Sequence, residues 1–401
     1  MIKAVKIRLL PTEKQEKLMF KSVGTARYAY NWGLNRWQEL YKEGVKPNGY
    51  SIKKEFNNTI KTQDEFEWLY EISAKITAQA FDDLQDAFNN FFKGMAKYPK
   101  FKSRKKSEQS FYVRYDRMNI KDNTVNIEKV GRVKFTTNYN IPELKTYANP
   151  RCSYDGKYWY LTFGFEQGEN QVELNPNLSI GIDLGIKKLA VINCSEEPIE
   201  NINKTREVRR LKKKLKRLKR KCSRKYEMNK ISLNENKTNK DAIRDETGNS
   251  QNKTNRDKPK FIKTKNIIKL EKEIKLIHRK LTNIRNNHIH QATNKIIKLR
   301  PIRVVIEDLN ITGMMKNKHL SEKIQEQKLY EFIRQIKYKC KFNGIKLIKA
   351  DRWFPSSKMC SNCGNIKNDL KLKDRLYVCR CGLEIDRDKN ASINLGNYKV
   401  S

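Results

Sequence analysis

Three acidic residues lie in or beside apolar segments, where a carboxylate is costly to desolvate unless it is paired or binds a metal ion. Asp183 falls inside an apolar run, Glu307 ends a second one, and Asp388 begins a predicted final helix. Hard oxygen ligands of this kind suit Mg²⁺. Two such ions can stabilise both the attacking and the leaving oxygen of a phosphodiester. These residues therefore predict a metal site that hydrolyses phosphodiester bonds.

Each of these acids, taken singly, also has a structural interpretation. Asp183 could cap a turn before Gly185, and Glu307 or Asp308 could pair with the many Lys and Arg residues. Either Asp386 or Asp388 could be the N-cap of the final helix. Their joint occurrence in a chain with a net charge of +41 favours the catalytic interpretation.

Four cysteines have the spacing of a zinc site. They form two close pairs, each followed by glycine: Cys360, Cys363, Cys379 and Cys381. Such turns can direct two thiolates each at one ion, and four sulfur ligands make a closed, structural site. Two disulfides or unrelated thiols are the alternatives, which an intracellular setting disfavours. The remaining cysteines lack partner spacing and are expected to be packing residues: Cys152, Cys194, Cys222 and Cys340.

The charge balance points to an anionic partner. The chain has 86 Lys and Arg residues against 45 Asp and Glu residues. Nucleic acid is the favoured partner, because each neutralised phosphate releases condensed counterions. A membrane surface is the rival, but it usually needs an amphipathic helix or a lipid anchor, and neither is visible. The segment Lys204–Lys225 has 14 basic residues and one acid, which predicts a helix that faces phosphates.

The sequence predicts a cytoplasmic protein. Residues 1–10 alternate apolar and basic side chains, which indicates a strand and not a secretory signal. No run approaches the ~18 to 20 apolar residues of a membrane span. In that compartment, cysteines are expected as thiols or metal ligands.

The elements that must position these groups begin with a strand and helices and continue with a β region. After the first strand, Thr12 and Gln15 have capping-box spacing at a helix start, and a second helix is expected from Glu65 to Lys93. From Pro99 onward, period-two runs between turn residues predict an all-β element such as a small barrel. Its entry, residues 100–106, is a basic arm that could equally be a solvated loop.

Near Ser179 an α/β pattern begins. Residues 180–184 and 189–192 predict a buried hairpin, followed by two heptad helices that should form an antiparallel pair. Between Ser223 and Thr264 the chain is polar and poor in apolar groups, which predicts a disordered or extended insertion at the tip of that pair. No function is assigned to it.

The order of these motifs resembles the OrfB/TnpB family of insertion sequences. Residues 181–188 (GIDLGIKK), 306–310 (IEDLN) and 386–394 (DRDKNASIN) are similar to its three RuvC motifs. Residues 354–364 (FPSSKMCSNCG) look like its zinc-ribbon entry. The start of the chain resembles its N-terminal helical region, so the likeness covers nearly the whole sequence.

That resemblance implies a multidomain α+β fold. It has an RNase H-like RuvC domain with an inserted zinc ribbon, and an N-terminal β-barrel interrupted by a helical recognition region. The expected boundaries are 1–10 and 98–175 for the wedge-like barrel, 11–97 for the helical region, 178–355 and 383–401 for the RuvC-like domain with a basic helical pair at 204–300, and 356–382 for the zinc ribbon.

The resemblance also implies an RNA-guided, Mg²⁺-dependent DNA endonuclease. Asp183, Glu307 and Asp388 would be the catalytic triad, with Zn²⁺ as the structural ion. The partners would be a guide RNA from the transposon end and double-stranded target DNA, bound by one protein chain near the nucleoid. Guide pairing would supply sequence specificity, while the protein reads backbone shape and a short flanking motif.

Five residues are candidates for nucleic-acid contacts. Lys75 and Gln79, one helical turn apart, resemble residues that read the flanking motif. The basic arm adds Lys102, Arg104 and Lys105.

Two departures and three alternatives accompany the resemblance. The second cysteine pair is C-x-C where C-x-x-C is commoner. The segment from Ser223 to Thr264 is longer and richer in Asn than the family pattern leads us to expect. A guide-dependent DNA-binding regulator without cutting activity would be expected to lack acids of the triad, and here all three are present. A miniature type V CRISPR effector is a closely related enzyme. A transposase that performs strand transfer is less favoured, because no second catalytic module is visible.

Overall fold

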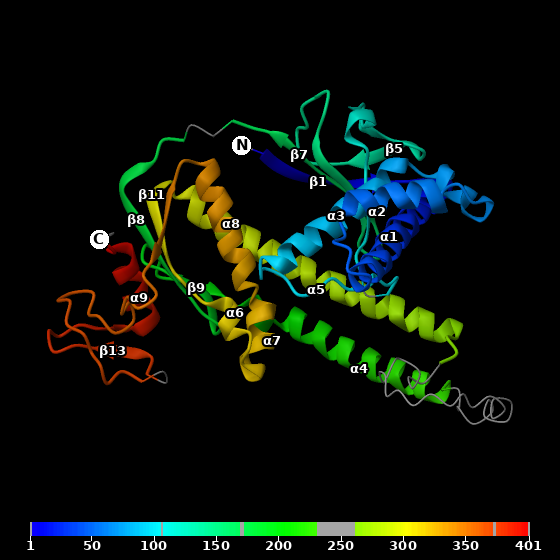
Figure 1. Ribbon diagram of the computed structural model, residues 1–401. Coiled ribbons are helices and arrows are strands. Elements are labelled where there is room, and N and C mark those ends of the chain that lie inside the picture. The colour runs from blue at the N-terminus through cyan, green and yellow to red at the C-terminus, as the bar shows by residue number, and fades with distance from the viewer. Residues whose placement is uncertain (1, 106, 169–171, 231–260, 372–373, 400–401) are drawn as a thin grey trace. The chain divides into compact units, whose positions relative to one another are not determined.

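A computed structural model describes residues 2–105, 107–168, 172–230, 261–371 and 374–399 (Figure 1). The chain divides into two compact units, Met1–Gly168 and Glu169–Ser401. The first combines a sheet with a helical part, and the second contains a mixed sheet and the four clustered cysteines. Within the described ranges no helix combines the length and the apolar character needed to cross a membrane.

The first unit is built on a seven-stranded sheet that forms a half-barrel. Its strands are β1 (Ile2–Leu10), β2 (Gln109–Tyr112), β3 (Ile120–Lys121), β4 (Thr124–Ile127), β5 (Gly131–Thr136), β6 (Ala148–Tyr154) and β7 (Trp159–Glu166). The order is β2-β6-β7-β1-β5-β4-β3. The N-terminal strand therefore lies in the middle of the sheet, and the other six strands come from residues 109–166. In β1, Val5, Ile7 and Leu9 are buried, which is the period-two pattern of a one-sided sheet.

The helices of the first unit confirm one prediction and correct another. Thr12 caps α1 (Glu13–Lys42), and the capping box with Gln15 is present. The single helix expected from Glu65 to Lys93 is wrong. Asp64–Glu71 forms a 3-10 helix, Ile72 is extended, and α3 (Ala74–Phe92) begins where Ser73 caps it. The short α2 (Gly49–Glu55) and the π-helical turn Phe56–Ile60 were not predicted.

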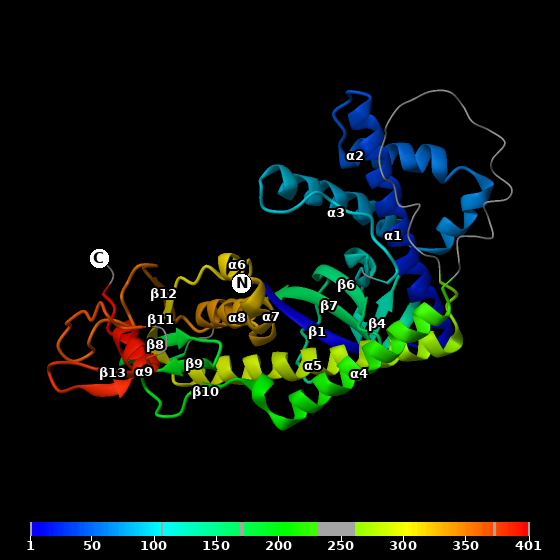
Figure 2. The same ribbon diagram turned by 90° about the horizontal axis from the view of Figure 1, so that it is seen from below.

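The second unit contains a five-stranded mixed sheet, seen beside α9 (Arg387–Gly396) in Figure 2. Its strands are β8 (Asn175–Leu184), β9 (Lys188–Ile192), β10 (Ile199–Glu200), β11 (Pro301–Glu307) and β12 (Lys346–Ala350), in the order β10-β9-β8-β11-β12. β8 and β9 are antiparallel, which confirms the predicted hairpin, whereas β8, β11 and β12 are parallel. Central parallel strands are buried on both faces, as their continuous apolar sequence indicates.

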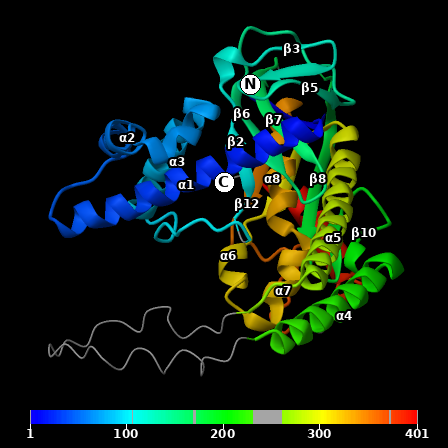
Figure 3. The ribbon, with the colours of Figure 1, turned by 90° about the vertical axis from the view of Figure 1, so that its right-hand side faces the viewer.

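Two long helices of the second unit pack together as predicted. They are α4 (Arg206–Met228) and α5 (Lys265–Lys298), which lie side by side in Figure 3. Glu207 pairs with Lys280, and Tyr226 donates a hydrogen bond to Glu271, so the two helices run antiparallel. The prediction of a disordered or extended insertion between Ser223 and Thr264 is wrong at its start, because α4 continues to Met228. Residues 231–260 of that segment lie outside the described ranges. Three shorter helices follow: α6 (Ile311–Met314), α7 (Lys318–Gln327) and α8 (Leu329–Phe342).

Candidate active site

Two of the predicted acids lie next to each other on neighbouring strands. In the parallel pair of β8 and β11, Ile182 is paired with Ile306. Asp183 and Glu307 are the next residues of these strands, so both carboxylates are at the same end of the sheet. In open α/β sheets, ligands bind outside the carboxyl ends of the strands.

Gly181 brings α9, which carries the third acid, against β8. A Cβ atom at Gly181 would lie 2.1 Å from the carbonyl oxygen of Ser392 and 2.2 Å from the amide nitrogen of Gly396. Only a residue without a side chain permits this approach of helix backbone to strand backbone. Gly181 and Asp183 are two positions apart and face the same side of the sheet. Asp183 is therefore on the side where α9 lies.

A polar network attaches α9 to the hairpin of β8 and β9. Asn193 accepts a 3.0 Å bond from the Gly181 amide and donates a 2.9 Å bond to the Ser179 carbonyl. The Ser179 hydroxyl donates to the carbonyl of Gly396 at the helix end, at 2.6 Å. At the helix start, the Lys389 amino group donates to the Asn193 carbonyl at 2.9 Å. Both ends of α9 are thus held by the β8–β9 hairpin, whose first strand carries Asp183.

The start of α9 separates the roles of its two acids. Asp386 is the N-cap, and its Oδ1 accepts bonds from the amides of Asp388 at 3.0 Å and Lys389 at 3.1 Å. The capping interpretation therefore applies to Asp386. The carboxylate of Asp388 is half-buried and lies 3.5 Å from the Arg375 guanidinium.

The charges of the other two predicted acids act on Asp183. Burial raises the pKa of Asp183 well above its usual range, and the negative charges of Glu307 and Asp388 raise it further. Arg387 opposes this shift. Among the described residues, no side chain donates a hydrogen bond to Asp183. A bound cation would compensate this concentration of negative charge, so the donor set fits a hard divalent metal ion.

The three predicted acids form a less compact set than the four cysteines. Over the described ranges, the four cysteines are the only set of three or more potential ligands whose donor atoms all lie within 4.8 Å of one another. The acids are close enough to shift a pKa, but they do not form an equally tight set.

Ser356 is a residue that the sequence analysis did not single out. Its hydroxyl donates a 2.6 Å bond to Oε1 of Glu307, and its carbonyl accepts a 2.8 Å bond from Asn394 of α9. Ser356 is buried. Its position within the predicted zinc-ribbon entry was the available signal, but nothing in the pattern marked this serine over Ser357. It connects the end of β11 to α9.

Asp308, next to Glu307, forms the ion pairs with Lys and Arg that the sequence analysis considered for these two acids. Arg352 lies 2.7 Å and Lys349 3.4 Å from its carboxylate, and their hydrogen bonds lower its pKa.

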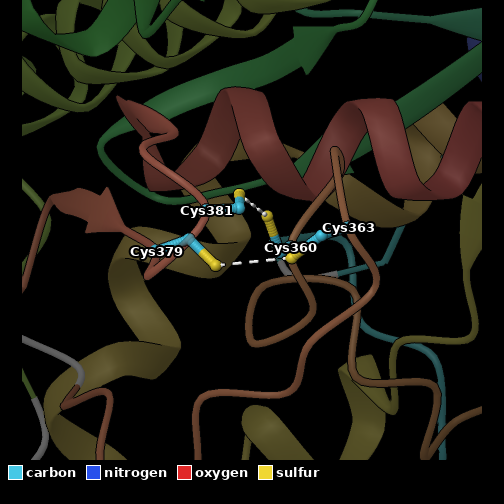
Figure 4. Close-up of side chains that lie close together, drawn as sticks. All are labelled: Cys360, Cys363, Cys379 and Cys381. Atoms are coloured by element: carbon cyan, nitrogen blue, oxygen red, sulfur yellow. Dashed lines mark hydrogen bonds between the residues drawn. The ribbon is translucent and has the colours of Figure 1, made fainter.

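The four predicted cysteines come together (Figure 4). Cys360 and Cys363 lie in a loop, while Cys379 and Cys381 lie between β13 (Leu376–Val378) and β14 (Glu384–Asp386). The Sγ atoms of Cys360 and Cys381 are 3.6 Å apart, and those of Cys363 and Cys379 are 3.5 Å apart. The glycine after each pair has a positive φ, 74° at position 364 and 87° at position 382, as expected for these turns.

This arrangement fits one tetrahedral zinc ion. Zn–S bonds of ~2.3 Å place neighbouring sulfurs about 3.8 Å apart. All four cysteines are free thiols, so the disulfide alternative is not what the structure contains. The amide of Leu383 and the side chain of Asn362 lower the pKa of Cys381 to about 6, which favours the thiolate that a metal ion binds. The short C-x-C spacing does not prevent the convergence.

The cysteine loop is fastened to α9 by two buried asparagines. Asn390 donates a 2.7 Å bond to the Met359 carbonyl and accepts a 3.0 Å bond from the Ser361 amide. Asn394 donates a second 2.7 Å bond to Met359. These residues are one helical turn apart and therefore share a face of α9. An ordered cysteine loop thus supports the helix that carries Asp388.

The remaining cysteines behave as expected with one exception. Cys152, Cys222 and Cys340 are buried, as predicted for packing residues. Cys194 is exposed, so that prediction was wrong for it. It directly follows Asn193 in the turn after β9.

In the first unit, Gln79 lies in a small cavity of about 240 Å³. Its amide donates a 3.2 Å bond to Asp83, which also receives two bonds from Arg151, at 2.6 Å and 3.0 Å. Lys102 lines the same cavity, with its amino group 3.7 Å from the centre of the Tyr30 ring.

The other three candidate contacts do not line that cavity. Arg104 and Lys105 are exposed, whereas burial lowers the pKa of Lys102 within the cavity. Lys75 is half-buried in the first turn of α3 and does not line the cavity. The structure therefore brings Gln79 and Lys102 together in one cavity, whose lining does not include the other three.

The basic residues of α4 have few acidic partners. Among the described residues, only Lys212 of this helix lies within ion-pair distance of an acid other than its neighbours in α4, at 2.7 Å from Glu326. One depression of the helix surface is lined entirely by Lys and Arg: Lys213, Lys216, Arg217, Arg220, Lys221 and Arg224. Unpaired charge of this density fits a polyanion.

The structure thus defines a mixed α/β protein with acids gathered at strand ends and a four-cysteine cluster fastened beside them. Three family models match it: a "Helix-turn-helix domain" of OrfB at residues 1–46, the OrfB "Probable transposase" at 162–318, and a "Cas12f1-like, TNB domain" at 330–395. The chain belongs to the OrfB/TnpB family, as its motifs predicted.

Relatives with similar sequences span nearly the whole chain. A protein of Streptomyces pristinaespiralis, provisionally named an RNA-guided DNA endonuclease, is 27% identical over 98% of this chain and 88% of its own length. The Escherichia coli K12 protein InsQ, with the same provisional name, is 24% identical over 94% of this chain and 87% of its own length. A solved structure of CasPhi-2 (Cas12j) bound to crRNA covers 99% of this chain and 98% of that one at 11% identity, with a TM-score of 0.44.

Proposed function

We propose that the protein is an RNA-guided DNA endonuclease of the TnpB type, with Asp183, Glu307 and Asp388 as its catalytic acids. The observation that carries this proposal is their convergence from β8, β11 and α9, segments that are far apart in the sequence. The names of the full-length relatives point to the same activity.

The fold that we assign to the second unit is the RNase H-like RuvC fold with an inserted zinc ribbon. A mixed sheet in the order β10-β9-β8-β11-β12, with its acids at the carboxyl ends of β8 and β11, supports this assignment. The domain boundaries follow the same reasoning: barrel at 1–10 and 98–175, helical region at 11–97, RuvC-like domain at 178–355 and 383–401, and zinc ribbon at 356–382.

Within this site each protein group has a definable task. Mg²⁺ held by the three carboxylates would supply a nucleophile and stabilise charge on the phosphodiester oxygens. Ser356 orients Glu307 through its hydroxyl. Asp386 completes the first turn of α9 and thereby fixes the backbone of Asp388. The cysteines would hold Zn²⁺ and keep the loop around Met359 in place for Asn390.

The partners that we propose are a guide RNA and double-stranded DNA. The unpaired basic residues of α4 support a phosphate-binding role for that helix. The protein would bind them as a single chain, with a guide derived from the transposon end. Reading of a flanking motif is assigned to Lys75 and Gln79, and backbone contacts to Lys102, Arg104 and Lys105.

Cleavage of a plasmid library with randomised flanks tests the proposal. The protein is co-expressed with its flanking RNA and a matching guide, and cleavage is measured with and without EDTA. Asp183→Ala should lose at least about a thousandfold in rate, whereas Glu322→Gln, an exposed acid of α7, should cut like the wild type. Guided binding with intact plasmid in every variant would instead identify a regulator. Metal-dependent cutting by Asp183→Ala would overturn the site assignment.

A further inference from the structure

Trp353 is unusually exposed. Its side chain is 86% exposed, the largest value for any large apolar side chain among the described residues. By contrast, Trp37 and Trp159 are buried, and Trp32 and Trp68 are half-buried. A single exposed apolar residue needs no functional explanation by itself. Its position in the structure is what makes it informative.

The segment that carries Trp353 is fixed on both sides to the end of β11. On one side, Arg352 pairs with Asp308 at 2.7 Å. On the other side, Ser356 donates its 2.6 Å bond to Glu307. Three residues of extended chain span at most about 11 Å, so the backbone of Trp353 lies within that distance of Ser356.

The backbone at Trp353 is held in a turn. Its amide donates a 2.8 Å bond to the carboxylate of Asp351, and the amide of Phe354 donates a 3.1 Å bond to the Asp351 carbonyl. The Tyr398 hydroxyl accepts a 3.2 Å bond from the Asp351 amide, and its ring packs edge-on against Phe354 at 4.9 Å. Trp353 is therefore presented to solvent from a fixed position.

An open cleft of about 480 Å³ adjoins this tryptophan. Its walls combine the aromatic rings of Trp353, Phe354 and Tyr398 with polar side chains that include Asp351 and Lys399. Lys399 lines the cleft, and Lys358 directly precedes Met359 of its wall. Both lysines are exposed, and neither has an acid within ion-pair distance in the described part of the chain. An aromatic surface with cations around it suits a base and its phosphates.

We propose that Trp353 is a stacking platform for a base of the single-stranded DNA that enters the carboxylate site. This inference rests on the proposed nuclease function and adds a substrate-binding residue to it. A duplex buries the faces of its bases, so only an unpaired strand can stack on the indole ring. With about 3.4 Å per nucleotide along a stacked strand, the base belongs to a nucleotide a few positions from the scissile phosphate.

A binding experiment isolates the contribution of the base. The full chain, kept in EDTA so that no cleavage occurs, is titrated with a short oligothymidine and with an oligonucleotide of equal length made of abasic residues. Both carry the same phosphates, so the ratio of their dissociation constants reports stacking alone. Trp353 is the exposed tryptophan of the described chain, and its fluorescence should be quenched by the oligothymidine and not by the abasic strand.

The variants have distinct expectations. The wild type should prefer oligothymidine, and Trp353→Ala should reduce that preference about fivefold to a hundredfold. Trp353→Phe should keep most of it, because a smaller ring still stacks. Tyr330→Ala, which removes a 70% exposed aromatic side chain from α8, is the matched control and should behave like the wild type. An unchanged preference in Trp353→Ala, or no preference in the wild type, would overturn the proposal.

Guided cleavage separates this inference from the proposed function. If the wild type does not cut, the nuclease proposal fails, but the fluorescence titration still decides whether Trp353 binds a base. If the wild type cuts, Trp353→Ala should raise KM for a single-stranded substrate more than it lowers kcat, and Trp353→Phe should restore KM. Normal KM and normal binding in Trp353→Ala would leave the nuclease standing and refute the stacking role.

Discussion

The hydroxyl of Ser356 lies 2.6 Å from Oε1 of Glu307, and this bond connects two parts of the candidate site. Through its carbonyl the same serine accepts a bond from Asn394 of α9, the helix that carries Asp388. The positions of two of the three acids therefore depend on one buried residue outside the triad, Glu307 through its hydroxyl and α9 through its backbone carbonyl.

Ser356→Ala should lower the guided cleavage rate about tenfold to a hundredfold, the usual effect of losing a group that orients a metal ligand. The reason is that Glu307 would lose its only side-chain donor among the described residues. Ser356→Thr keeps the hydroxyl and should recover most of the rate. Titration with Mn²⁺, followed by electron paramagnetic resonance, should show weaker metal binding in the alanine variant. An affinity for Mn²⁺ that is equal in Ser356→Ala and in the wild type would contradict the positioning role.

Gly181→Ala should displace α9 and lower the free energy of unfolding by about 3 kcal/mol or more. Its Cβ would lie 2.1 Å from a helix carbonyl, and backbone on both sides leaves nothing flexible to move away. Chemical denaturation and guided cleavage are the measurements. The control is Gly24→Ala in α1, where no atom lies within 4 Å of the new Cβ. That change should stabilise the helix by about 1 kcal/mol. A Gly181→Ala variant as stable and active as the wild type would rule out the close packing described for α9.

Replacement of Cys381 by serine should remove zinc. We expect one zinc ion per chain in the wild type and much less than one in Cys381→Ser after dialysis against a chelator, measured by mass spectrometry of the metal content. Cleavage should fall as well, since the loop at Met359 would no longer support α9. Cys194→Ser, a change at an exposed cysteine outside the cluster, should keep its zinc. Zinc retained equally in both variants would exclude the four-cysteine site.

Neutralising three basic residues of α4 should weaken the salt dependence of nucleic-acid binding. In the combined variant Lys213→Gln, Arg217→Gln and Arg220→Gln, the slope of log K against log salt for duplex DNA should decrease by up to about 2.7, at ~0.9 per lost phosphate contact. Affinity measured at several salt concentrations gives the slope.

The matched control for α4 removes equal charge from another surface of the same unit. Lys337→Gln, Lys341→Gln and Lys346→Gln change exposed residues of α8 and β12. Their combined variant should leave the slope near the wild-type value. Equal effects from both sets would mean that net charge alone, and not the face of α4, determines binding.

Lys339 should make stability depend on pH in the alkaline range. The buried amino group donates to Thr293 and to the His290 carbonyl, and burial lowers its pKa from 10.5 to about 8. Between these values the unfolded chain binds this proton more strongly than the folded chain. The free energy of unfolding should therefore rise as the pH increases from about 8 toward 10.5, by at most roughly 2 to 3 kcal/mol.

Lys339→Met isolates that contribution, because other thiols and phenols titrate in the same range. Urea unfolding of both proteins at neutral and alkaline pH is the measurement. The stability advantage of the methionine variant should be largest at neutral pH and shrink as the pH rises. A constant difference would show that Lys339 is not desolvated.

Local sequence was sufficient for the elements whose signals are self-contained. The Thr12–Gln15 capping box, the β8–β9 hairpin and the α4–α5 pair follow from residues close in the chain, and the structure contains all three. The region before α3 was predicted poorly, because the helical periodicity of Glu65–Lys93 continued through Ser73. There the serine side chain caps a new helix and interrupts the old pattern.

The sequence by itself determined which groups could do chemistry: three acids in apolar settings and four cysteines in paired turns. It did so because residue type and short spacing are sufficient to indicate ligand chemistry. Only the structure decided which acid of the last motif is the cap, since the backbone amides that donate hydrogen bonds to Asp386 reach its carboxylate only in the folded turn. It also decided that Ser356, Asn390 and Asn394 hold the site together. Their partners are far along the chain or on another element, and a hydrogen bond depends on distances in space that no local pattern encodes.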